Sequence, residues 1–261
     1  MSAGETVLIT GSSSGIGLEL AKCFAADGCK LILIARNSDA LERLAEELRL
    51  KNKIEAIVLT ADLSLLETPK RILHELSAQK IFVDVLVNNA GFGLHDEFVK
   101  LPLQRQLEII QVNVTALTEL TGLFLPGMIE RKRGGILNVA SVAGFLPGPN
   151  MAVYYASKAF VLSFTEALAE ELRGSGLTVS AFCPGGTETN FSQVAREGKS
   201  RMTKTTKMTA GQAARYGHGA FRKNQVVAIP GLQNRFLVFL TRILPRRVIR
   251  KAVHSFNKLE K

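Results

Sequence analysis

The stretch Thr6–Gly17, which reads TVLITGSSSGIG, decides the fold of this chain. Its first half is an apolar, β-branched run typical of a buried strand, and its second half is rich in glycine. Glycines allow a tight turn in which the backbone approaches a pyrophosphate, and a helix that begins directly after the turn offers free N–H groups and the positive end of its dipole. The pattern favours a phosphate-binding turn over an ordinary strand-to-helix turn. We expect its cofactor contacts from Gly11, Ser13, Ser14, Gly15, Ile16 and Gly17.

Outward from this turn, strand-like runs alternate with helical periodicity along most of the chain. The strand-like runs are nearly continuous in apolar residues, which is typical of strands covered on both faces. Helical stripes lie between them, the longest over Leu103–Met128 and Ala152–Arg173. This alternation predicts an α/β fold with a doubly wound parallel sheet of the Rossmann type, in a single domain. The expected strands are Val7–Thr10, Leu31–Ala35, Ile54–Thr60, Val83–Asn88, Gly135–Ala140, Thr178–Phe182 and Val226–Ile229.

The domain boundaries are predicted from the point at which the alternation of strands and helices ends. We expect a dinucleotide-binding domain of the Rossmann type over residues 1–231 and a basic amphipathic extension over residues 232–261. The stretch from Thr187 to about Thr209 is polar and aperiodic, and it follows the carboxyl end of a strand. Long insertions at that place are candidates for substrate lids, so we expect a lid over about residues 187–215.

Composition narrows the class of protein. The chain has 261 residues, 46% of them hydrophobic, which is enough for one large core. No uninterrupted apolar run reaches the length of a spanning helix, and no basic segment followed by an apolar one opens the sequence, so a cytoplasmic protein is expected. Three cysteines without CxxC spacing and four scattered histidines indicate no metal site. The net charge of +10 admits nucleic acid, an anionic membrane or an anionic ligand.

The end of the second strand-like run bears on the cofactor. It reads Ala35-Arg36-Asn37, without the acidic residue that usually meets a ribose hydroxyl at this point. Arg36 is instead placed to pair with a 2′-phosphate, which favours NADP(H) over NAD(H). Asp62, with Leu63 beside it, lies too far along the chain for the ribose role and fits contact with the adenine edge.

Tyr154 and Lys158 form the candidate acid–base pair. A spacing of four places both on one face of a helix, one turn apart. A nearby ammonium favours a phenolate and is expected to lower the pKa of the tyrosine, as an acid–base catalyst needs. Tyr155 has Ala159 at the corresponding position, so the pairing selects Tyr154.

Five motifs occur together and in order, and jointly they resemble the short-chain dehydrogenase/reductase family over about Thr6 to Gly231. They are the glycine turn, Asn88-Asn89-Ala90-Gly91, Ser141 thirteen residues before Tyr154, Lys158, and Pro184-Gly185 with Thr189. The resemblance implies the strand order 3-2-1-4-5-6-7, a small-molecule carbonyl or alcohol substrate, and a homodimer or homotetramer through the two long helices.

The resemblance also implies residue roles. Ser141 would hydrogen-bond the substrate oxygen, Tyr154 would give or take the proton, and Lys158 would hold the nicotinamide ribose and depress the tyrosine pKa. Asn113 would hold a water of the proton relay. Further cofactor contacts would come from Asn89, Ala90, Gly91, Tyr154, Lys158, Pro184, Gly185, Thr187 and Thr189.

The C-terminal segment departs from the usual short ending. Arginines and lysines alternate there with large apolar residues, and Pro245 is expected to divide the segment into two short helices. A basic amphipathic helix is typical of membrane-surface binding, here through residues 235–261, but its apolar face could equally cover the substrate cleft or a subunit interface. No nucleic-acid-binding module is recognisable, so we expect no nucleic-acid partner.

Three functions remain open from the sequence. The first is an NADP(H)-dependent oxidoreductase that interconverts a ketone and a secondary alcohol on an apolar, 3-oxoacyl or steroid-like substrate. The second is a sugar or polyol dehydrogenase, for which Glu188, Asn190 and His95 would supply polar contacts. The third is a membrane-associated protein that binds NADP(H) without turnover, against which the intact set of Ser141, Tyr154 and Lys158 argues.

Overall fold

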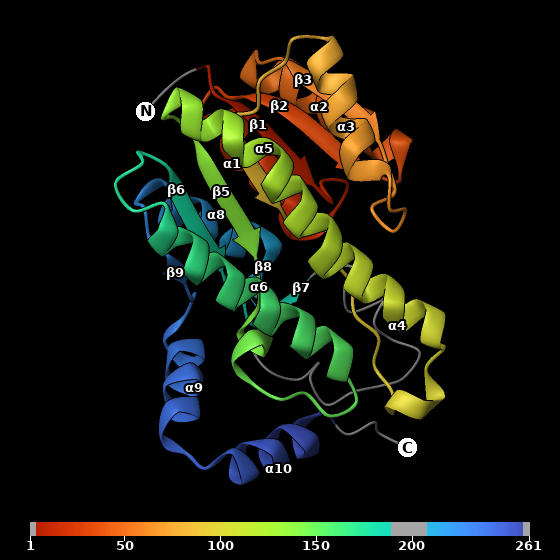
Figure 1. Ribbon diagram of the computed structural model, residues 1–261, viewed down its shortest axis with the longest axis vertical. Helices are drawn as coiled ribbons and strands as arrows, with labels where there is room; N and C mark the ends of the chain where they lie inside the picture. The colour runs from red at the N-terminus through yellow and green to blue at the C-terminus, as the bar shows by residue number, and fades with distance from the viewer. Residues whose placement is uncertain (1–3, 189–207, 258–261) are drawn as a thin grey trace.

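The computed structural model describes residues 4–188 and 208–257 and has a parallel, seven-stranded sheet at its centre (Figure 1). The strand order is β3-β2-β1-β4-β5-β6-β9, and every pair of neighbours is parallel. This order confirms the expected doubly wound sheet, in which strands are added on one side of β1 up to β3 and on the other side from β4 onward. The strands are β1 (Thr6–Thr10), β2 (Lys30–Ala35), β3 (Ala56–Thr60), β4 (Val85–Asn88), β5 (Gly135–Val139), β6 (Thr178–Phe182) and β9 (Val227–Ala228).

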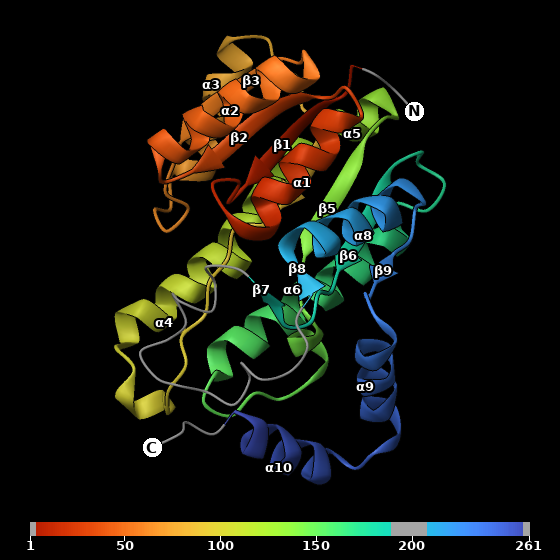
Figure 2. The same ribbon diagram turned by 180° about the vertical axis from the view of Figure 1, so that it is seen from behind.

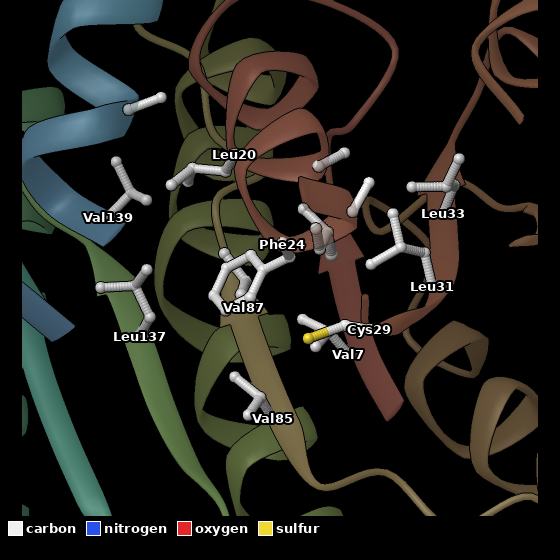
Figure 3. Packing of buried hydrophobic residues seen from close by; sticks show 14 of the residues in the cluster. Val7, Leu20, Phe24, Cys29, Leu31, Leu33, Val85, Val87, Leu137 and Val139 are labelled. Carbon is white, nitrogen blue, oxygen red and sulfur yellow. The ribbon is translucent and has the colours of Figure 1, made fainter. Parts of the chain in front are cut away.

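Helices cover both faces of the sheet. Successive strand residues point to opposite faces, and because the strands are nearly continuous in apolar residues, both faces carry apolar side chains that the helices bury. In β1, Val7 and Ile9 join the core beneath one helical layer, while Leu8 joins the core beneath the other. The first layer holds α1 (Gly15–Ala26), α2 (Ser38–Asn52) and α8 (Ala210–Arg222), and Figure 3 shows Leu20 and Phe24 of α1 over the strand residues. The second holds α3 (Thr68–Ala78), α5 (Leu117–Arg131) and α6 (Ala152–Glu171).

The long helix expected over Leu103–Met128 is interrupted. It consists of α4 (Leu103–Ile110), a π-helical turn over Gln111–Ala116, and α5, which runs on to Arg131. Within the described residues, Leu103–Arg131 is the one helix whose length and composition would let it cross a membrane. Leu120, Phe124 and Met128 are nevertheless buried against the sheet, as in the core helix of a globular domain.

Most of the expected lid, residues 189–207, lies outside the described residues. On either side of it, β7 (Thr187–Glu188) pairs in parallel with β8 (Met208–Thr209). Thr209 and Gln212 then form a capping box that starts α8. Residues 210–215 are therefore helical, and Ala213 and Ala214 are buried in the core beside α1 instead of forming part of a lid.

The C-terminal extension forms two helices, as the position of Pro245 predicts. They are α9 (Leu232–Ile243) and α10 (Arg246–Phe256), with Pro245 at the start of the second. In Figures 1 and 2 both lie beyond the carboxyl ends of the strands, below the body of the domain. Val253 packs against the small core of Ala143, Met151 and Tyr155, so the extension is joined to the catalytic domain.

Candidate active site

One cavity of about 1520 Å³ lies at the carboxyl ends of the strands. Pockets for single small ligands commonly measure roughly 300–1,000 Å³, so this one has room for a dinucleotide and a second molecule. It extends from the glycine turn after β1 past the end of β2 to Ser141, Tyr154 and Lys158. Ligands of open α/β sheets bind at this edge, where the strand order reverses.

The glycine turn is shaped for a phosphate. Gly11 and Gly15 have φ angles of +66° and +58°, in the left-handed region that favours glycine. Ser14 precedes the first residue of α1, and its side chain makes no capping hydrogen bond to the helix. Because the side chain of Ser14 does not cap the helix, the N–H groups of its first turn remain available to an anion. Gly11, Ser13, Ser14, Gly15 and Ile16 all line the cavity.

Gly17 has a different role from the one expected. It does not line the cavity, and a Cβ at this position would lie 2.3 Å from both Asn89 Nδ2 and Gly11 O. Asn89 Nδ2 donates to Thr10 O at 2.9 Å and to Gly11 O at 3.1 Å. Gly17 thus lets the side chain of Asn89 reach and hold the turn.

The end of β2 carries the expected cation. Arg36 is exposed and lines the cavity together with Asn37, Asp62 and Leu63. Partial burial acts to raise the pKa of Asp62, but the hydrogen bond from Ser64 N at 2.9 Å and the charge of Arg36 hold that pKa below its usual value. Asp62 is therefore a carboxylate acceptor at neutral pH, in keeping with contact to the amino group of a purine.

Ser141, Tyr154 and Lys158 lie close together at the wall of the cavity. Ser141 follows β5 and caps a short 3₁₀ helix, its Oγ accepting from Ala143 N at 3.1 Å, while Tyr154 and Lys158 lie in the first turns of α6. All three line the cavity. Lys158 Nζ lies 5.9 Å from the centre of the Tyr154 ring and donates to Val139 O at 2.8 Å.

The pKa of Tyr154 departs from the direction that its pairing with lysine predicts. Burial raises this pKa to about 12, although a hydrogen bond with Ser141 acts to lower it. Burial also lowers the pKa of Lys158 to about 8, because the ammonium loses hydration. The phenol of Tyr154 is therefore protonated at neutral pH and is placed to donate a proton.

Asn113 lies beneath these residues, in the π-helical turn. Its Nδ2 donates to Phe92 O and to Ser157 Oγ, both at 3.0 Å, and its Oδ1 accepts from Phe92 N at 3.1 Å. The side chain thus pins the loop after β4 to α6. Asn113 does not itself line the cavity. Its position in a π-helical turn is nevertheless typical of residues near functional sites.

The remaining predicted site residues fall into three groups. Asn89, Ala90, Gly91, Pro184, Gly185 and Thr187 all line the cavity. Thr189 and Asn190 lie outside the described residues. Glu188 is exposed, while His95 is buried at the cavity wall and bonded through Nε2 to Asn257 O at 3.0 Å.

The C-terminal helices form a wall of the cavity whose side chains were not among the predicted site residues. Asn234 and Leu237 of α9 and Val253 and Phe256 of α10 line the cavity. The amphipathic pattern predicts that these helices have an apolar face, and covering the substrate cleft is one of the three roles that the sequence allows for that face. Nothing in the pattern singled out these side chains.

Other reactive groups in the described residues offer no second chemistry. These residues contain no group of three His, Cys, Asp or Glu side chains that could hold a metal ion. Burial raises the pKa of Cys23 and of Cys29 to about 11, and that of Cys183 to about 12. The thiols are therefore protonated and unreactive at neutral pH.

Known proteins share this sequence pattern. The family model described as short chain dehydrogenase matches residues 5–200. The very-long-chain 3-oxoacyl-CoA reductase of Rattus norvegicus is 32% identical over 267 residues, which cover 98% of this chain and 80% of the rat protein. Several further curated relatives are covered over less than two thirds of their own length.

Solved structures share the architecture. A short-chain dehydrogenase from Sphingobium yanoikuyae in complex with NADPH has a TM-score of 0.81 and 31% identity, covering 96% of this chain and 95% of that one. The bulky-bulky ketone specific alcohol dehydrogenase from Comamonas testosteroni has a TM-score of 0.79 and 29% identity, with 93% of each chain covered. With the site geometry, these matches show that the chain belongs to the short-chain dehydrogenase/reductase family of NAD(P)-dependent oxidoreductases.

Proposed function

We propose that this protein is an NADP(H)-linked reductase of an apolar ketone. The observation that carries the proposal is the single cavity that joins the glycine turn and Arg36 to Ser141, Tyr154 and Lys158. A dinucleotide held at the first end would present its nicotinamide to the second, and bound there it supplies the hydride. The protein supplies binding, orientation and the proton.

The described side chains divide the remaining chemistry. Ser141 Oγ donates a hydrogen bond to the carbonyl oxygen, where negative charge develops during reduction. Tyr154, protonated at neutral pH, delivers the proton to the same oxygen. Lys158 keeps positive charge near the phenol that is losing its proton, and Asn113 fixes the loop of Phe92 beside them. A protonated Tyr154 is the form that the reduction of a ketone requires.

Arg36 supports the choice of NADP(H). An exposed guanidinium at the end of β2 can pair with a 2′-phosphate in a bidentate manner, and the Sphingobium relative was solved with NADPH. A charged hydrogen bond contributes about 1.5–3 kcal/mol, so Arg36→Ala should weaken NADPH about 10- to 150-fold and leave NADH almost unchanged. Calorimetry of both cofactors tests this, with Arg43→Ala as the control because Arg43 is exposed on α2 and does not line the cavity. Equal losses for both cofactors would contradict the assignment.

The walls of the substrate end support an apolar ketone. Leu146, Met151, Leu237, Val253 and Phe256 line it, and the named relatives act on 3-oxoacyl-CoA or bulky ketones. A sugar or polyol would need several polar partners there. Of the three side chains suggested for that role, Glu188 is exposed and His95 is already bonded to Asn257 O.

Turnover of defined ketones tests the function. We expect NADPH oxidation with a long-chain 3-oxoacyl thioester or a diaryl ketone and much less with a keto-sugar. Tyr154→Phe should lower kcat by about 10²- to 10⁴-fold while NADPH still binds. Preferred turnover of the keto-sugar would support the polyol reading. NADPH binding without any turnover would revive a role that needs no catalysis.

The assembly and location of the protein remain proposals. Leu107 and Ile110 of α4 and Phe160 of α6 are exposed apolar residues on the two long helices, which supports a homodimer or homotetramer formed there. Light scattering after gel filtration should show a dimer or larger, and Leu107→Glu with Phe160→Glu should give a monomer. A cytoplasmic location is proposed on the sequence alone.

A further inference from the structure

Asn257, which follows the last residue of α10, is a polar residue that is fully buried. Its main-chain oxygen accepts from His95 Nε2 and from Asn150 Nδ2, both at 3.0 Å. Its side-chain Nδ2 donates to Pro149 O at 3.0 Å and to Tyr155 Oη at 3.4 Å. We call these four hydrogen bonds the Asn257 clasp.

The clasp joins three parts of the site. His95 belongs to the loop after β4, Pro149 and Asn150 precede α6, and Tyr155 is next to Tyr154. Asp96 N also donates to Asn150 O at 3.0 Å, so the two loops are held to each other as well as to α10. The clasp is therefore a fixed point at the catalytic end of the cavity.

The clasp attaches the C-terminal end of α10 to the loops beside the cavity. A helix of eleven residues is too short to be stable alone, so its position depends on tertiary contacts. Ile249 is buried and Val253 and Phe256 line the cavity, one turn or two along the same face. With Asn257 fixed, this apolar face forms the wall of the substrate end.

We propose that Asn257 is a specificity-determining positioning residue, which holds α10 as the wall that binds the apolar body of an extended ketone. The proposal rests on the proposed function, because it names a determinant of the substrate of that same site. A small ketone does not reach Val253 and Phe256 and needs the wall little. An extended apolar ketone packs on it and needs it in place.

Kinetics with two ketones test the positioning role. In the full-length protein, Asn257→Ala removes the two donations from Nδ2, and Asn257→Asp removes them while keeping the shape of the side chain. Both should raise KM for a diaryl ketone at least about tenfold, the range that loss of apolar contact gives, with kcat much less affected. KM for butanone and the affinity for NADPH should change less than about twofold. Ser255→Ala, exposed on α10, is the control.

Hydrogen exchange and calorimetry test the Asn257 clasp without requiring turnover. Hydrogen exchange in α10 should be faster in Asn257→Ala and unchanged in β1 and α1, and calorimetry should show weaker binding of the diaryl ketone. Equal losses for both ketones, or a lower Tm with an unchanged ratio of KM values, would overturn the positioning role. If no ketone turns over, the proposed function fails, and unchanged exchange and ketone binding would then overturn the clasp independently.

A second inference rests on the opposite, outer face of α9. Leu232, Phe236, Phe239 and Ile243 follow one another at intervals of four, three and four residues and so share one helical face. Their side chains are 81%, 62%, 55% and 62% exposed. We call these four residues the α9 stripe. It is too regular and too large for singly scattered surface residues.

Charge identifies the partner of the α9 stripe. Residues 232–257 contain six arginines and lysines and no acidic residue. Arg235 is bonded to Ile229 O and Tyr216, and the other five cations are exposed on α9 and α10: Arg242, Arg246, Arg247, Arg250 and Lys251. A two-fold contact with a second copy would set this positive surface against itself. An anionic bilayer instead accepts both the apolar side chains and the cations.

The structure thus assigns the outer face of α9, with the cations of α10, to docking on an anionic lipid surface. The same two helices wall the substrate end of the cavity, so a docked protein would hold that end near the membrane. Docking itself does not depend on the proposed reaction and is tested without turnover.

Vesicle co-sedimentation tests this docking. The protein should bind vesicles of equal parts phosphatidylcholine and phosphatidylglycerol, and scarcely bind phosphatidylcholine alone. Binding should fall at least about tenfold in Arg246→Glu with Arg247→Glu, and in Phe236→Ser with Phe239→Ser. Leu50→Ser, an exposed leucine on α2, should bind as the unaltered protein does. Equal binding to both vesicles, or an oligomer that the stripe variant dissociates, would overturn the assignment.

Discussion

At the scale of single residues, burial controls the protons of the site. Reduction requires Tyr154 and Lys158 to be protonated, and their pKa values are about 12 and about 8. Both protons are bound at a pH below the lower value, so kcat/KM for reduction should be level there. It should fall as the pH rises through about 8, where Lys158 loses its charge. A pH profile with NADPH and a ketone measures this, and a profile that falls toward acid would point to another group.

The absence of a side chain at Gly93 leaves room for the ring of Tyr154. A Cβ at this residue would lie 2.9 Å from Cγ and Cδ2 of Tyr154, so Gly93→Ala must displace either the loop or the ring. Misplacement by about 1 Å can cost roughly 10²-fold in rate, and we expect a kcat lower by about 10- to 100-fold with NADPH binding retained. Gly122→Ala is the matched control, because a Cβ there meets nothing within 4 Å. An unchanged kcat in Gly93→Ala would mean that the ring has more freedom than the geometry indicates.

At the scale of elements, a buried carboxylate ties the amino ends of the strands together. Asp84, just before β4, accepts from Thr6 N of β1 at 3.0 Å and from Arg133 Nη2 at 2.9 Å. It lies at the sheet edge opposite the cavity. Asp84→Ala should lower the free energy of unfolding by about 1–3 kcal/mol, because a buried N–H loses its acceptor, and should leave KM unchanged.

Urea denaturation followed by circular dichroism measures the Asp84 effect. Asp39→Ala is the comparison, since Asp39 is exposed in the first turn of α2 and should contribute less than about 1 kcal/mol. A loss no greater than that of Asp39→Ala would show that Asp84 does not hold the amino ends of the strands together.

The elements also show how far sequence can predict this fold. The strands form almost where the apolar runs are, because a strand buried on both faces has few alternatives to a continuous run. The break at Gln111–Ala116 could not be predicted, since the apolar stripe continues through it and Asn113 is held there by Phe92 and Ser157. Those partners come from other segments of the chain.

The same distinction applies to the site. Tyr154 and Lys158 could be proposed from the sequence because a spacing of four places both on one face of a helix. Ser141 could be proposed only from the family resemblance, because it precedes Tyr154 by thirteen residues and follows a different element, β5. The direction of the Tyr154 pKa could not, because it depends on burial by the whole fold. Asn257 could not be predicted either, because its partner His95 lies 162 residues away along the chain.

At the scale of the whole molecule, cofactor binding should stabilise the fold. Residues from both halves of the sheet line the cavity, so a ligand that contacts both halves binds the folded state and not the unfolded state. At a concentration one hundred times its Kd, NADPH should add about 2.7 kcal/mol, which for a chain of this size raises Tm by roughly 5–10 °C. NADH at the same concentration should raise Tm by much less, because it lacks the phosphate for Arg36. Differential scanning fluorimetry measures both shifts, and equal shifts would remove the basis for NADP(H) as the cofactor.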